Sequence, residues 1–476
     1  MSVNVFKYVE SEPPTYILPV HKSSYRHKKI VNLLLLTDGE NSHYVLIKSM
    51  AAFLKVKTAY GKSGHACDLC FRVFYSLITY MKHIDFCRTG EPTVEMPDDP
   101  VLKFKNFKYR MPNPITIYAD FEAYNCKVNE EITESTKLLC EQKPSGYGYT
   151  VVSPYTQFCK PTVIYRGTDA ADVFVQNILA ECYEVESVLS EVKPMEFTEE
   201  DSESFSNSDN CSICEGRLYW ETQNICRDHC HITGKFRGAA HSYCNIMMQQ
   251  QKKVIVYFHN AKGYDNHFLI KSLAANPGIG EIDVLGQTSE KYTRISTKHF
   301  VVHDSMSHLV GSLDSLSSSL RQRGDNGFQL IRQEFSEDLK FQCVIRKLVY
   351  PYDYIDSFEK FAEPIPCKEA FYNKLSEEEL SDDEYNRLLR TCEIFKIKTL
   401  GQLHDLYLQI DVLILACVFE DYRRLGLEMF GLDPCYYVSS PSYSFDAMLC
   451  TTKVELELLT DKEMYNFFEK GKCYTN

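Results

Sequence analysis

Two acidic residues, two positions apart in a β-rich stretch of the chain, have a spacing that suits metal-ion chemistry. The stretch IYADFEAYN carries Asp120 and Glu122. On a strand, residues i and i+2 point to the same face. Two carboxylates on one face of a buried strand repel each other, which destabilises the fold unless a cation lies between them. One such pair is a weak signal, so it has to be weighed together with the acids elsewhere.

Two further acidic motifs occur downstream on different kinds of element. The stretch VYFHNAKGYDNHFL ends a strand at Asn260 and begins a helix at Asp265, with Tyr264 just before it. The stretch HDLYLQIDVLILA places Tyr407 and Asp411 one helical turn apart on one face of an apolar helix. Each motif alone could be a helix cap or a surface residue. In this order, on strand, strand-to-helix junction and helix, they form a recognisable set.

A compact Cys/His cluster precedes these motifs. The stretch CDLCFRVFYSLITYMKHIDFC has the spacing of a small zinc finger, in which a C-x-x-C knuckle and a helical pair supply four ligands. Two aromatic residues fall where the small core of a finger belongs. We therefore expect a structural zinc ion; the finger could contact DNA or could hold the N-terminal region together. The expected ligands are Cys67, Cys70, His83 and Cys87, and the core residues are Phe74 and Tyr80.

A second cluster uses a different spacing and is not a copy of the first. The C-x-x-C pair at 211 and 214 is followed by DHCHITGKFRGAAHSYCN, which packs three histidines and two cysteines into residues 228–245. This is more than one zinc ion needs, so the residues alone leave the set of four ligands open.

Composition bounds the class of protein. With 476 residues the chain is too long for one ordinary core and suggests two to four domains. A net charge of −13 argues against a generally basic nucleic-acid binder, although residues 1–110 carry sixteen Lys and Arg against ten Asp and Glu. Its N-terminus lacks a signal pattern and no apolar run approaches ~18 residues. We therefore expect an intracellular and nuclear protein with reduced cysteines and no membrane partner.

The elements that position the motifs are a mixture of strands and helices. An acidic, serine-rich stretch at 195–210 is typical of a flexible connector. We expect strands within 30–47, 114–125, 152–167, 253–260 and 294–305, and helices at 169–187, from Asp265 onward, and at 313–323, 376–395 and 399–430.

The three acidic motifs resemble the Exo I, Exo II and Exo III motifs of family B DNA polymerases, with the tyrosine form of the third. The stretches YPYDYIDSFEKFAE and GLDPCYYVSSPSYSFDAM, among others, look like the protein-primed polymerases of Maverick/Polinton-type elements, and the resemblance runs from about residue 30 to about residue 470. The sequence departs from the second motif in one respect: four residues, not three, separate Asn260 and Asp265. Gly263 gives the loop room for the extra residue.

This resemblance implies an RNase H-like 3′→5′ exonuclease acting on single-stranded DNA. Two Mg²⁺ or Mn²⁺ ions ~3.5–4 Å apart would generate the attacking hydroxide and stabilise the leaving 3′ oxygen. Phe121 and Tyr264 would stack on bases, although a core role is as good an interpretation. A terminal protein primer is an implied partner. The implied metal ligands are Asp120, Glu122, Asp265 and Asp411, with Tyr407 orienting the water and Asn260 contacting the 3′-terminal nucleotide.

The second cluster resembles recombination endonuclease VII, a ββα-metal nuclease. Arg237 would contact a phosphate, and Cys226, Cys230 and His231 are left over, so another ligand set stays open. The module would nick branched DNA, or would keep only a DNA-binding or structural role. The resemblance implies zinc ligands Cys211, Cys214, His241 and Cys244, with His241 replacing the family's cysteine; Asp228 and Asn245 would hold Mg²⁺, and His229 would be the general base.

The expected fold class is α/β (α+β), an RNase H-like exonuclease domain with small zinc-stabilised modules. The palm motifs of a complete family B polymerase are absent, and the chain departs from the family at Lys472, so we expect a truncated member without polymerase activity. The expected domains are 1–63 (β-rich), 64–90 (finger), 110–195 with 253–430 (split exonuclease), 196–252 (inserted zinc module) and 431–476 (start of the polymerase region).

Overall fold

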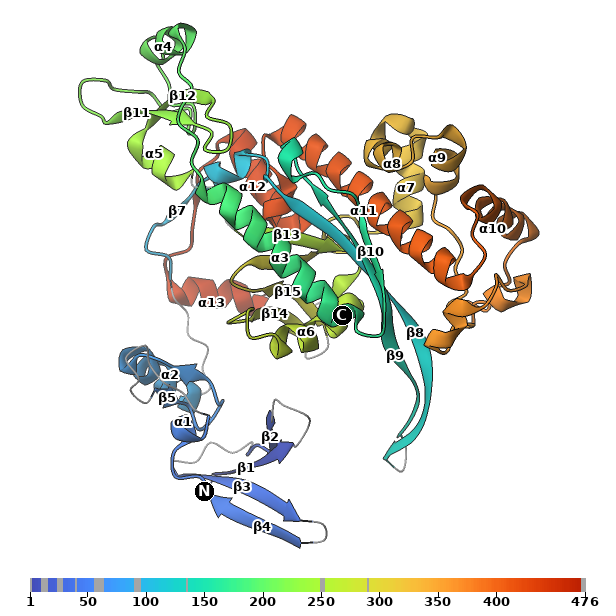
Figure 1. The fold of residues 1–476 in the computed structure, drawn as a ribbon. Helices are drawn as coiled ribbons and strands as arrows, with labels where there is room; N and C mark the ends of the chain where they lie inside the picture. Colours follow the sequence, from blue (N-terminus) through green and yellow to red (C-terminus); the bar gives the residue numbers. More distant parts are fainter. Residues whose placement is uncertain are drawn as a thin grey trace. The chain divides into compact units, whose positions relative to one another are not determined.

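The structure is a computed structural model that divides into two compact units, Met1–Leu102 with Leu456–Asn476, and Lys103–Glu455 (Figure 1). Each unit is described by itself. The departure expected at Lys472 lies outside the described residues. Those residues are 2–9, 16–23, 29–38, 41–54, 64–89, 96–133, 136–248, 253–288 and 291–471.

A seven-stranded mixed sheet forms the centre of the larger unit, in the order β10-β9-β8-β13-β16-β15-β14. The inner strand β13 runs parallel to β8 and to β16, whereas the other neighbours are antiparallel. The expected mixed α/β class is therefore confirmed. The strands are β8 (Thr116–Thr133), β9 (Thr136–Val152), β10 (Val163–Arg166), β13 (Val254–Phe258), β14 (Asp283–Thr288), β15 (Lys291–Ser296) and β16 (Phe300–Asp304).

Helices cover both faces of this sheet, because alternate residues of β8 are apolar on both sides. Ile117 and Phe121 pack into the core formed with α3 and α6, whereas Tyr118 packs into the core formed with α11. Figure 1 shows these helices beside the sheet. Asp120 and Glu122 therefore point to the α11 side. The helices of this unit outside the zinc module are α3 (Ala170–Ser190), α6 (Asp265–Ala275), α7 (Leu313–Gln322), α8 (Gln329–Glu334), α9 (Asp338–Val344), α10 (Asp382–Phe395), α11 (Leu400–Phe430) and α12 (Ser440–Thr452).

Helix α11 is the structural axis of the unit. It begins at a capping box in which Thr399 and Gln402 satisfy each other's backbone donors, and it ends at Gly431 in the left-handed conformation. By length and composition alone this helix could cross a membrane, but its apolar window is 83% buried within the unit, as in a core helix.

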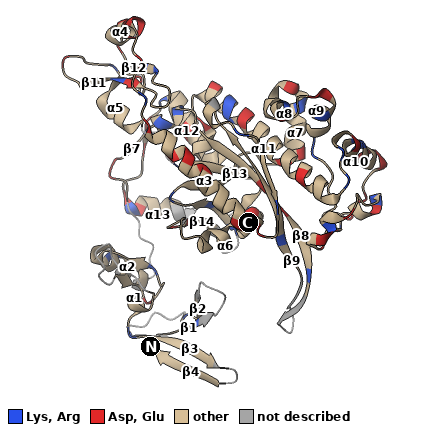
Figure 2. Ribbon diagram, in the orientation of Figure 1, with Lys and Arg blue, Asp and Glu red and all other residues tan. Residues whose placement is uncertain are grey.

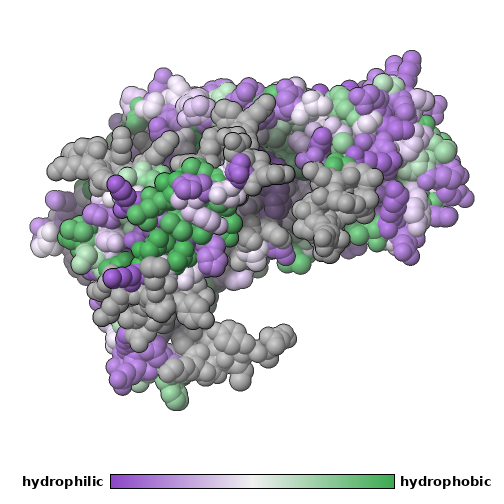
Figure 3. Space-filling model, turned by 90° about the horizontal axis from the view of Figure 1, so that it is seen from below, coloured by the Kyte–Doolittle hydropathy of each residue, from purple (hydrophilic) through white to green (hydrophobic). Residues whose placement is uncertain are grey.

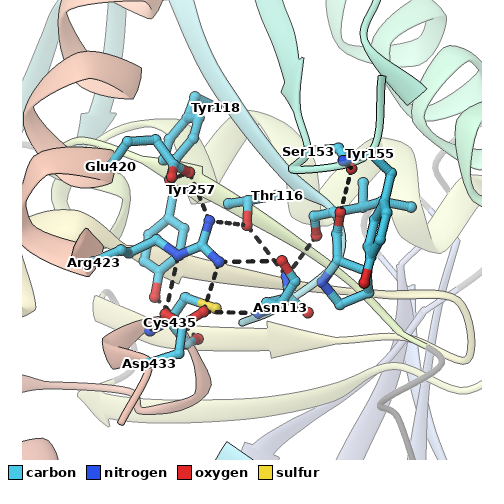
Figure 4. A network of polar contacts seen from close by, with 12 residues as sticks. Asn113, Thr116, Tyr118, Ser153, Tyr155, Tyr257, Glu420, Arg423, Asp433 and Cys435 are labelled. Carbon is cyan, nitrogen blue, oxygen red and sulfur yellow. Dashed lines mark hydrogen bonds and ion pairs between the residues drawn. The ribbon is translucent and has the colours of Figure 1, made fainter. Parts of the chain in front are cut away.

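A buried polar network joins the start of β8 to the end of α11 (Figure 4). The Arg423 guanidinium donates to both carboxylate oxygens of Asp433, at 3.0 and 2.6 Å, and to the Thr116 hydroxyl at 3.1 Å. Asp433 also accepts the Asn113 N–H at 2.8 Å. Since both charges are buried and fully bonded, the network fixes the position of α11 relative to β8.

One expected element is wrong. The acidic stretch 195–210 contains helix α4 (Glu199–Ser206), whose acidic residues stand out in Figure 2, rather than a flexible connector. Thr198 and Asp201 form a capping box, and acids in the first turn interact favourably with the helix dipole. Phe205 packs against the core of the second zinc cluster, which supplies the burial that the composition hides.

The smaller unit consists of a four-stranded sheet, in the order β2-β1-β3-β4, and the finger. Apolar side chains of β3 and β4, including Leu36 and Leu46, are exposed on this unit. Figure 3 shows apolar residues gathered on one face of the molecule. Its elements are β1 (Ser2–Val9), β2 (Tyr16–His21), β3 (Ile30–Asp38), β4 (Asn41–Leu46), α1 (Met50–Phe53), β5 (His65–Ala66), β6 (Val73–Phe74), α2 (Leu77–Thr89), β7 (Val101–Leu102), β17 (Leu456–Glu457) and α13 (Lys462–Gly471).

Candidate metal centres

Three of the four predicted exonuclease carboxylates meet beside α11. One ligand atom each of Asp120, Glu122 and Asp411 lies within 4.8 Å of the others. Asp120 and Glu122 come from β8, and Asp411 comes from the middle of α11, almost three hundred residues later in the chain. The structure thus brings the first and third acidic motifs together at one place.

Two glycines on β9 let α11 approach the sheet closely enough for this meeting. Gly148 pairs with Asp120 and Gly146 pairs with Glu122 in the antiparallel register. A Cβ atom on Gly146 would lie 2.5 Å from the His404 ring, and one on Gly148 would lie 3.1 Å from Val412 Cγ2. These glycines were missed in the sequence, where PSGYGYT looks only like a weak strand.

The fourth carboxylate, Asp265, lies beside the group but outside it. It is 1% exposed at the start of α6, and its Oδ1 accepts the N–H of Phe121 at 3.3 Å. Burial raises the pKa of Asp265 from its ordinary 3.8 to about 7. Its charge also contributes to the raised pKa of Asp120.

Burial and mutual repulsion disfavour the ionised forms of the grouped carboxylates. Burial raises the pKa of Asp120 well above its usual range, and the neighbouring charges of Asp265 and Asp411 raise it further. Burial, followed by the charge of Asp411, likewise raises the pKa of Glu122. A divalent cation would reverse these shifts because it stabilises the ionised forms.

One partly buried cation, whose side chain is 31% exposed, already lies in the group and was not predicted. The Lys347 ammonium is 2.8 Å from Asp411 Oδ2 and lies over the Tyr407 ring at 5.3 Å. Although burial opposes it, the charge of Asp411 raises the pKa of Lys347 above its ordinary value. The lysine stands in RKLVYPYDY, where two basic residues before an aromatic run are the signal for it.

Lys347 does not satisfy all the carboxylate oxygens of the group, so the group can also bind a metal cation. Asp411 Oδ1 is buried and has no hydrogen-bond partner within the part of the chain that the structure describes. An orphaned carboxylate oxygen is costly, and carboxylate oxygens are the ligands that Mg²⁺ and Mn²⁺ prefer. The group therefore has both the chemistry and a free lone pair for a divalent ion.

Tyr407 lies one turn before Asp411 on α11 and is 1% exposed. Its hydroxyl is 2.7 Å from the hydroxyl of Tyr352, a residue that the sequence prediction also missed. Burial raises the pKa of Tyr407 well above its usual range, followed by the charge of Asp411. The phenol therefore stays protonated and can act as a hydrogen-bond donor at this place.

The carboxylates open into a cavity of about 920 Å³. Asn260 lines it with an exposed side chain, and Tyr264 lines it as a partly buried one. Burial raises the pKa of Tyr264 as well. Both predicted substrate contacts thus lie in the cavity that holds the acids.

Phe121 was predicted either to stack on bases or to lie in the core, and the structure places it in the core. Phe121 is 1% exposed and stacks on Phe258 with 5.8 Å between ring centroids, inside the core formed with α3. The reason is the strand period, because a residue between Asp120 and Glu122 must point to the opposite face.

The finger ligands are brought together as predicted. Ligand atoms of the four residues lie within 4.8 Å of one another, and Cys70 Sγ is 3.1 Å from His83 Nε2. Burial, and then the neighbouring Cys67 thiol, raises the pKa of Cys87 to about 12, which a zinc ion would reverse. The predicted core residues Phe74 and Tyr80 pack against this cluster. The four residues could hold zinc.

Buried amides attach the finger to the four-stranded sheet. Asn4 on β1 donates to the Asn32 side chain at 2.8 Å and to the Asp68 carbonyl at 2.9 Å, and Asn32 donates to the Asp68 carboxylate at 2.8 Å. Asp68 stands in the C-x-x-C knuckle. This favours the alternative in which the finger holds the N-terminal region together.

The second cluster has a ββα arrangement of β11 (Ile225–His229), β12 (Phe236–His241) and α5 (Ser242–Met247). His241 Nδ1 lies 3.5 Å from Cys214 Sγ and 3.7 Å from Cys244 Sγ, and its Nε2 donates to the Arg217 carbonyl at 3.2 Å. The Nδ1 lone pair therefore faces the thiols, as a zinc ligand requires. Atoms within 4.8 Å of one another come from Cys211, Cys214, His241 and Cys244, so these four could hold zinc.

The three cysteine and histidine residues left over in the sequence lie elsewhere in the module. The Cys226 thiol donates to the Ala240 carbonyl at 3.5 Å, and Cys230 Sγ lies 3.7 Å from the Tyr155 hydroxyl. The ring of His231 lies 4.9 Å from that of His229. The arrangement therefore favours the ligand set that the resemblance implies.

The predicted catalytic residues of the module are arranged differently from the prediction. Asp228 is 3% exposed, and Arg237 donates to both of its oxygens, from Nε at 2.8 Å and from NH2 at 2.6 Å. Arg237 thus binds a carboxylate in the structure rather than standing free for a phosphate. Burial raises the pKa of the Cys226 thiol, and the Ser242 and Asn245 side chains oppose that shift. Asp228 and His229 belong to none of the metal-binding groups found among the described residues.

Comparison with known proteins identifies one part of the chain. No curated protein matches it. Residues 190–266 match the family model described as Recombination endonuclease VII. This stretch contains the whole second cluster, α5 and the start of α6. The resemblance to family B polymerases stays a prediction, whereas the endonuclease VII-like module within residues 190–266 is confirmed.

Proposed function

We propose that the larger unit is a metal-dependent nuclease that removes nucleotides from 3′ ends of single-stranded DNA. The observation that carries the proposal is the group of Asp120, Glu122 and Asp411 in a cavity, with Asp411 Oδ1 buried and free of partners among the described residues. The order of the three acidic motifs in the sequence gives the reaction class, as the family B exonuclease motifs imply.

The residues that would hold divalent ions are Asp120, Glu122 and Asp411, with Asp265 beside them. When bound, Mg²⁺ or Mn²⁺ would lower the pKa of the attacking water and neutralise charge on the phosphate. Lys347 is close enough to Asp411 to supply positive charge to the same phosphate oxygens.

Tyr407 would donate a hydrogen bond to the attacking water and orient it. Its hydroxyl is held at 2.7 Å by Tyr352, so the phenol enters the site with one fixed partner. Asn260 and Tyr264 would bind the terminal nucleotide, because both line the cavity next to the acids.

We further propose that the ββα module binds DNA and depends on zinc for its fold. The family match over residues 190–266 and the arrangement of the four zinc ligands support this role. A second candidate is nicking of branched DNA through His229, favoured by the intact Asp228, His229 and Asn245 set. The bidentate contact from Arg237 speaks against it, because a metal ion would have to displace a buried ion pair.

From the order of the acidic motifs we also propose that the protein is related to family B polymerases that act in DNA replication. A terminal protein primer and a nuclear location belong to the same proposal. Genomic sequence beyond codon 476 provides a direct check, since an in-frame palm would extend the proposal to polymerisation.

The exonuclease proposal is tested with 5′-labelled single-stranded DNA in Mn²⁺. The wild-type protein should give a ladder of products shortened from the 3′ end, and Asp120→Asn with Glu122→Gln should remove it. A substrate with 3′-terminal phosphorothioate linkages controls for 5′ or internal cleavage. A wild-type protein without a ladder, or a double variant with an unchanged one, would reject the proposal.

A further inference from the structure

Asn260, which lines the cavity, has an unusual backbone. Its φ is 68° and its ψ is 28°, in the left-handed region that non-glycine residues adopt at a cost. Asparagine tolerates this region better than most residues. Asn260 stands between β13 and the short turn Ala261–Gly263. Contacts from other segments therefore have to hold its backbone in this one conformation.

Asp304, at the end of β16, supplies these contacts. One carboxylate oxygen accepts the Asn260 N–H at 2.9 Å and the Met306 N–H at 3.0 Å, and the other accepts the Lys262 N–H at 3.2 Å. Asp304 is 1% exposed. A buried carboxylate with three backbone donors is a strong and directional anchor.

A second contact fixes the Asn260 side chain. A Cβ atom on Gly263 would lie 2.9 Å from Asn260 Oδ1 and 3.4 Å from Asn260 Nδ2. The amide therefore lies across the bare backbone of Gly263, the residue that gives room to the extra position in this loop. The φ of Gly263 is not in the positive region, so alanine would alter the space and not the backbone.

The adjacent histidine ties the same two loops together. His259 Nε2 donates to the Gly311 carbonyl at 2.9 Å, and its Nδ1 is 2.9 Å from the Ser305 hydroxyl. The segment after β16 is thus bound to the Asn260 turn through both Asp304 and His259. The turn cannot shift without moving the cavity wall beside Ser312.

We propose that Asp304 and Gly263 are positioning residues for the nucleotide contact of Asn260. Asp304 fixes the left-handed turn, and Gly263 leaves the space in which the amide lies, so that the amide enters the cavity in one orientation. This inference rests on the proposed exonuclease function. Neither residue supplies a ligand to the carboxylate group, although the charge of Asp304 adds to the raised pKa of the neighbouring Asp265. The main effect of both substitutions should therefore fall on substrate binding and not on the chemical step.

The test is steady-state digestion of single-stranded DNA in Mn²⁺ by Asp304→Asn and Gly263→Ala. Asp304→Asn replaces an acceptor oxygen with an amide that cannot accept from all three donors. Loss of charge-assisted hydrogen bonds predicts a KM rise of about tenfold or more, with kcat within about twofold. Gly263→Ala should raise KM by about threefold to tenfold, with an unchanged melting temperature, because the flexible amide is what has to move.

Thr399→Ala provides a control for general destabilisation. Thr399 caps α11 through the Gln402 N–H at 3.3 Å, away from Asn260. Its loss should lower the melting temperature without raising KM. A Gly263→Ala protein with wild-type KM, or an Asp304→Asn protein that loses kcat and not KM, would overturn the positioning role. An inactive wild-type protein would instead reject the exonuclease proposal itself.

Discussion

Two regions of the larger unit carry candidate catalytic carboxylates, and they neutralise them differently. In the cavity, Asp120, Glu122 and Asp411 share one cation, Lys347, and one buried oxygen of Asp411 has no hydrogen-bond partner among the described residues. In the ββα module, Arg237 binds both oxygens of Asp228.

This difference indicates that the carboxylates of the cavity, and not Asp228 of the module, require a metal ion. Carboxylates crowded in a buried group keep raised pKa values and an unmet demand for positive charge. A carboxylate in a bidentate arginine pair has its charge and its lone pairs satisfied. The family match points to the module, whereas the electrostatics point to the cavity, so experiments have to separate the two regions.

The largest expected effect comes from a matched pair of substitutions, one in each region. Asp411→Asn should reduce the rate of 3′ nucleotide release by about a thousandfold, because it removes a metal ligand. Asp228→Asn should leave that rate within about twofold. Equal losses in both variants, measured with labelled single-stranded DNA, would show that the regions do not act separately.

A smaller but still large effect is expected where α11 approaches the sheet. Gly148→Val would force its side chain into Val412 and Ile164 and push Asp411 away from Asp120. Overpacking of this kind typically destabilises a protein by ~1–3 kcal/mol, and the displaced ligand should lower exonuclease activity by about a hundredfold. The melting temperature and the rate should fall together. An active, destabilised variant would mean that α11 tolerates the shift.

Metal binding to the cavity should depend on pH in a defined direction. The folded protein keeps the Asp265 proton up to about pH 7, whereas the unfolded chain releases it near pH 3.8. Between these values the folded state binds more protons, so the free energy of unfolding of the metal-free protein should fall as pH rises. Mn²⁺ should therefore raise the melting temperature more at pH 8 than at pH 5.

Asp265→Asn is the control for this dependence. The variant should make the fall between about pH 4 and pH 7 less steep in the metal-free protein, whereas the raised pKa values of Asp120 and Glu122 should preserve part of it. Thermal unfolding across this range, with and without Mn²⁺, measures both effects. A metal-free protein that becomes more stable as pH rises through this window would contradict the role assigned to burial.

The smallest effect on exonuclease activity is expected from the second zinc cluster. Cys244→Ser should lower the zinc content from two ions to one per chain and leave the 3′ exonuclease rate within about threefold. Cys226→Ser is the matched control, because Cys226 lies outside the ligand group, and it should keep both ions. Elemental analysis of the purified proteins decides between the ligand sets. If Cys226→Ser loses a zinc ion and Cys244→Ser does not, the ligand set assigned to the second cluster is wrong.

The sequence predicted the local features of the unit better than its long-range contacts. Strand and helix periods place Asp120, Asp265 and Asp411 on the expected elements. The same period-two rule also excludes Phe121 from the cavity face, a consequence that the sequence prediction left open.

What the sequence could not give depends on contacts between distant segments. Lys347 follows α9 outside any regular element and reaches Asp411 only through the fold. Gly146 and Gly148 matter only because a helix from 250 residues later packs on them. Helix α4 was hidden by an acidic composition whose stabilising partner, the zinc-cluster core around Phe205, is a tertiary contact.

Titration of Mn²⁺ at pH 8, followed by electron paramagnetic resonance, tests the central claim most directly. The wild-type protein should bind Mn²⁺ saturably, Asp120→Asn with Glu122→Gln should abolish that binding, and Asp228→Asn should leave it unchanged. Binding that survives the double substitution, or that disappears in Asp228→Asn, would contradict the assignment of the divalent-cation site to the cavity beside α11.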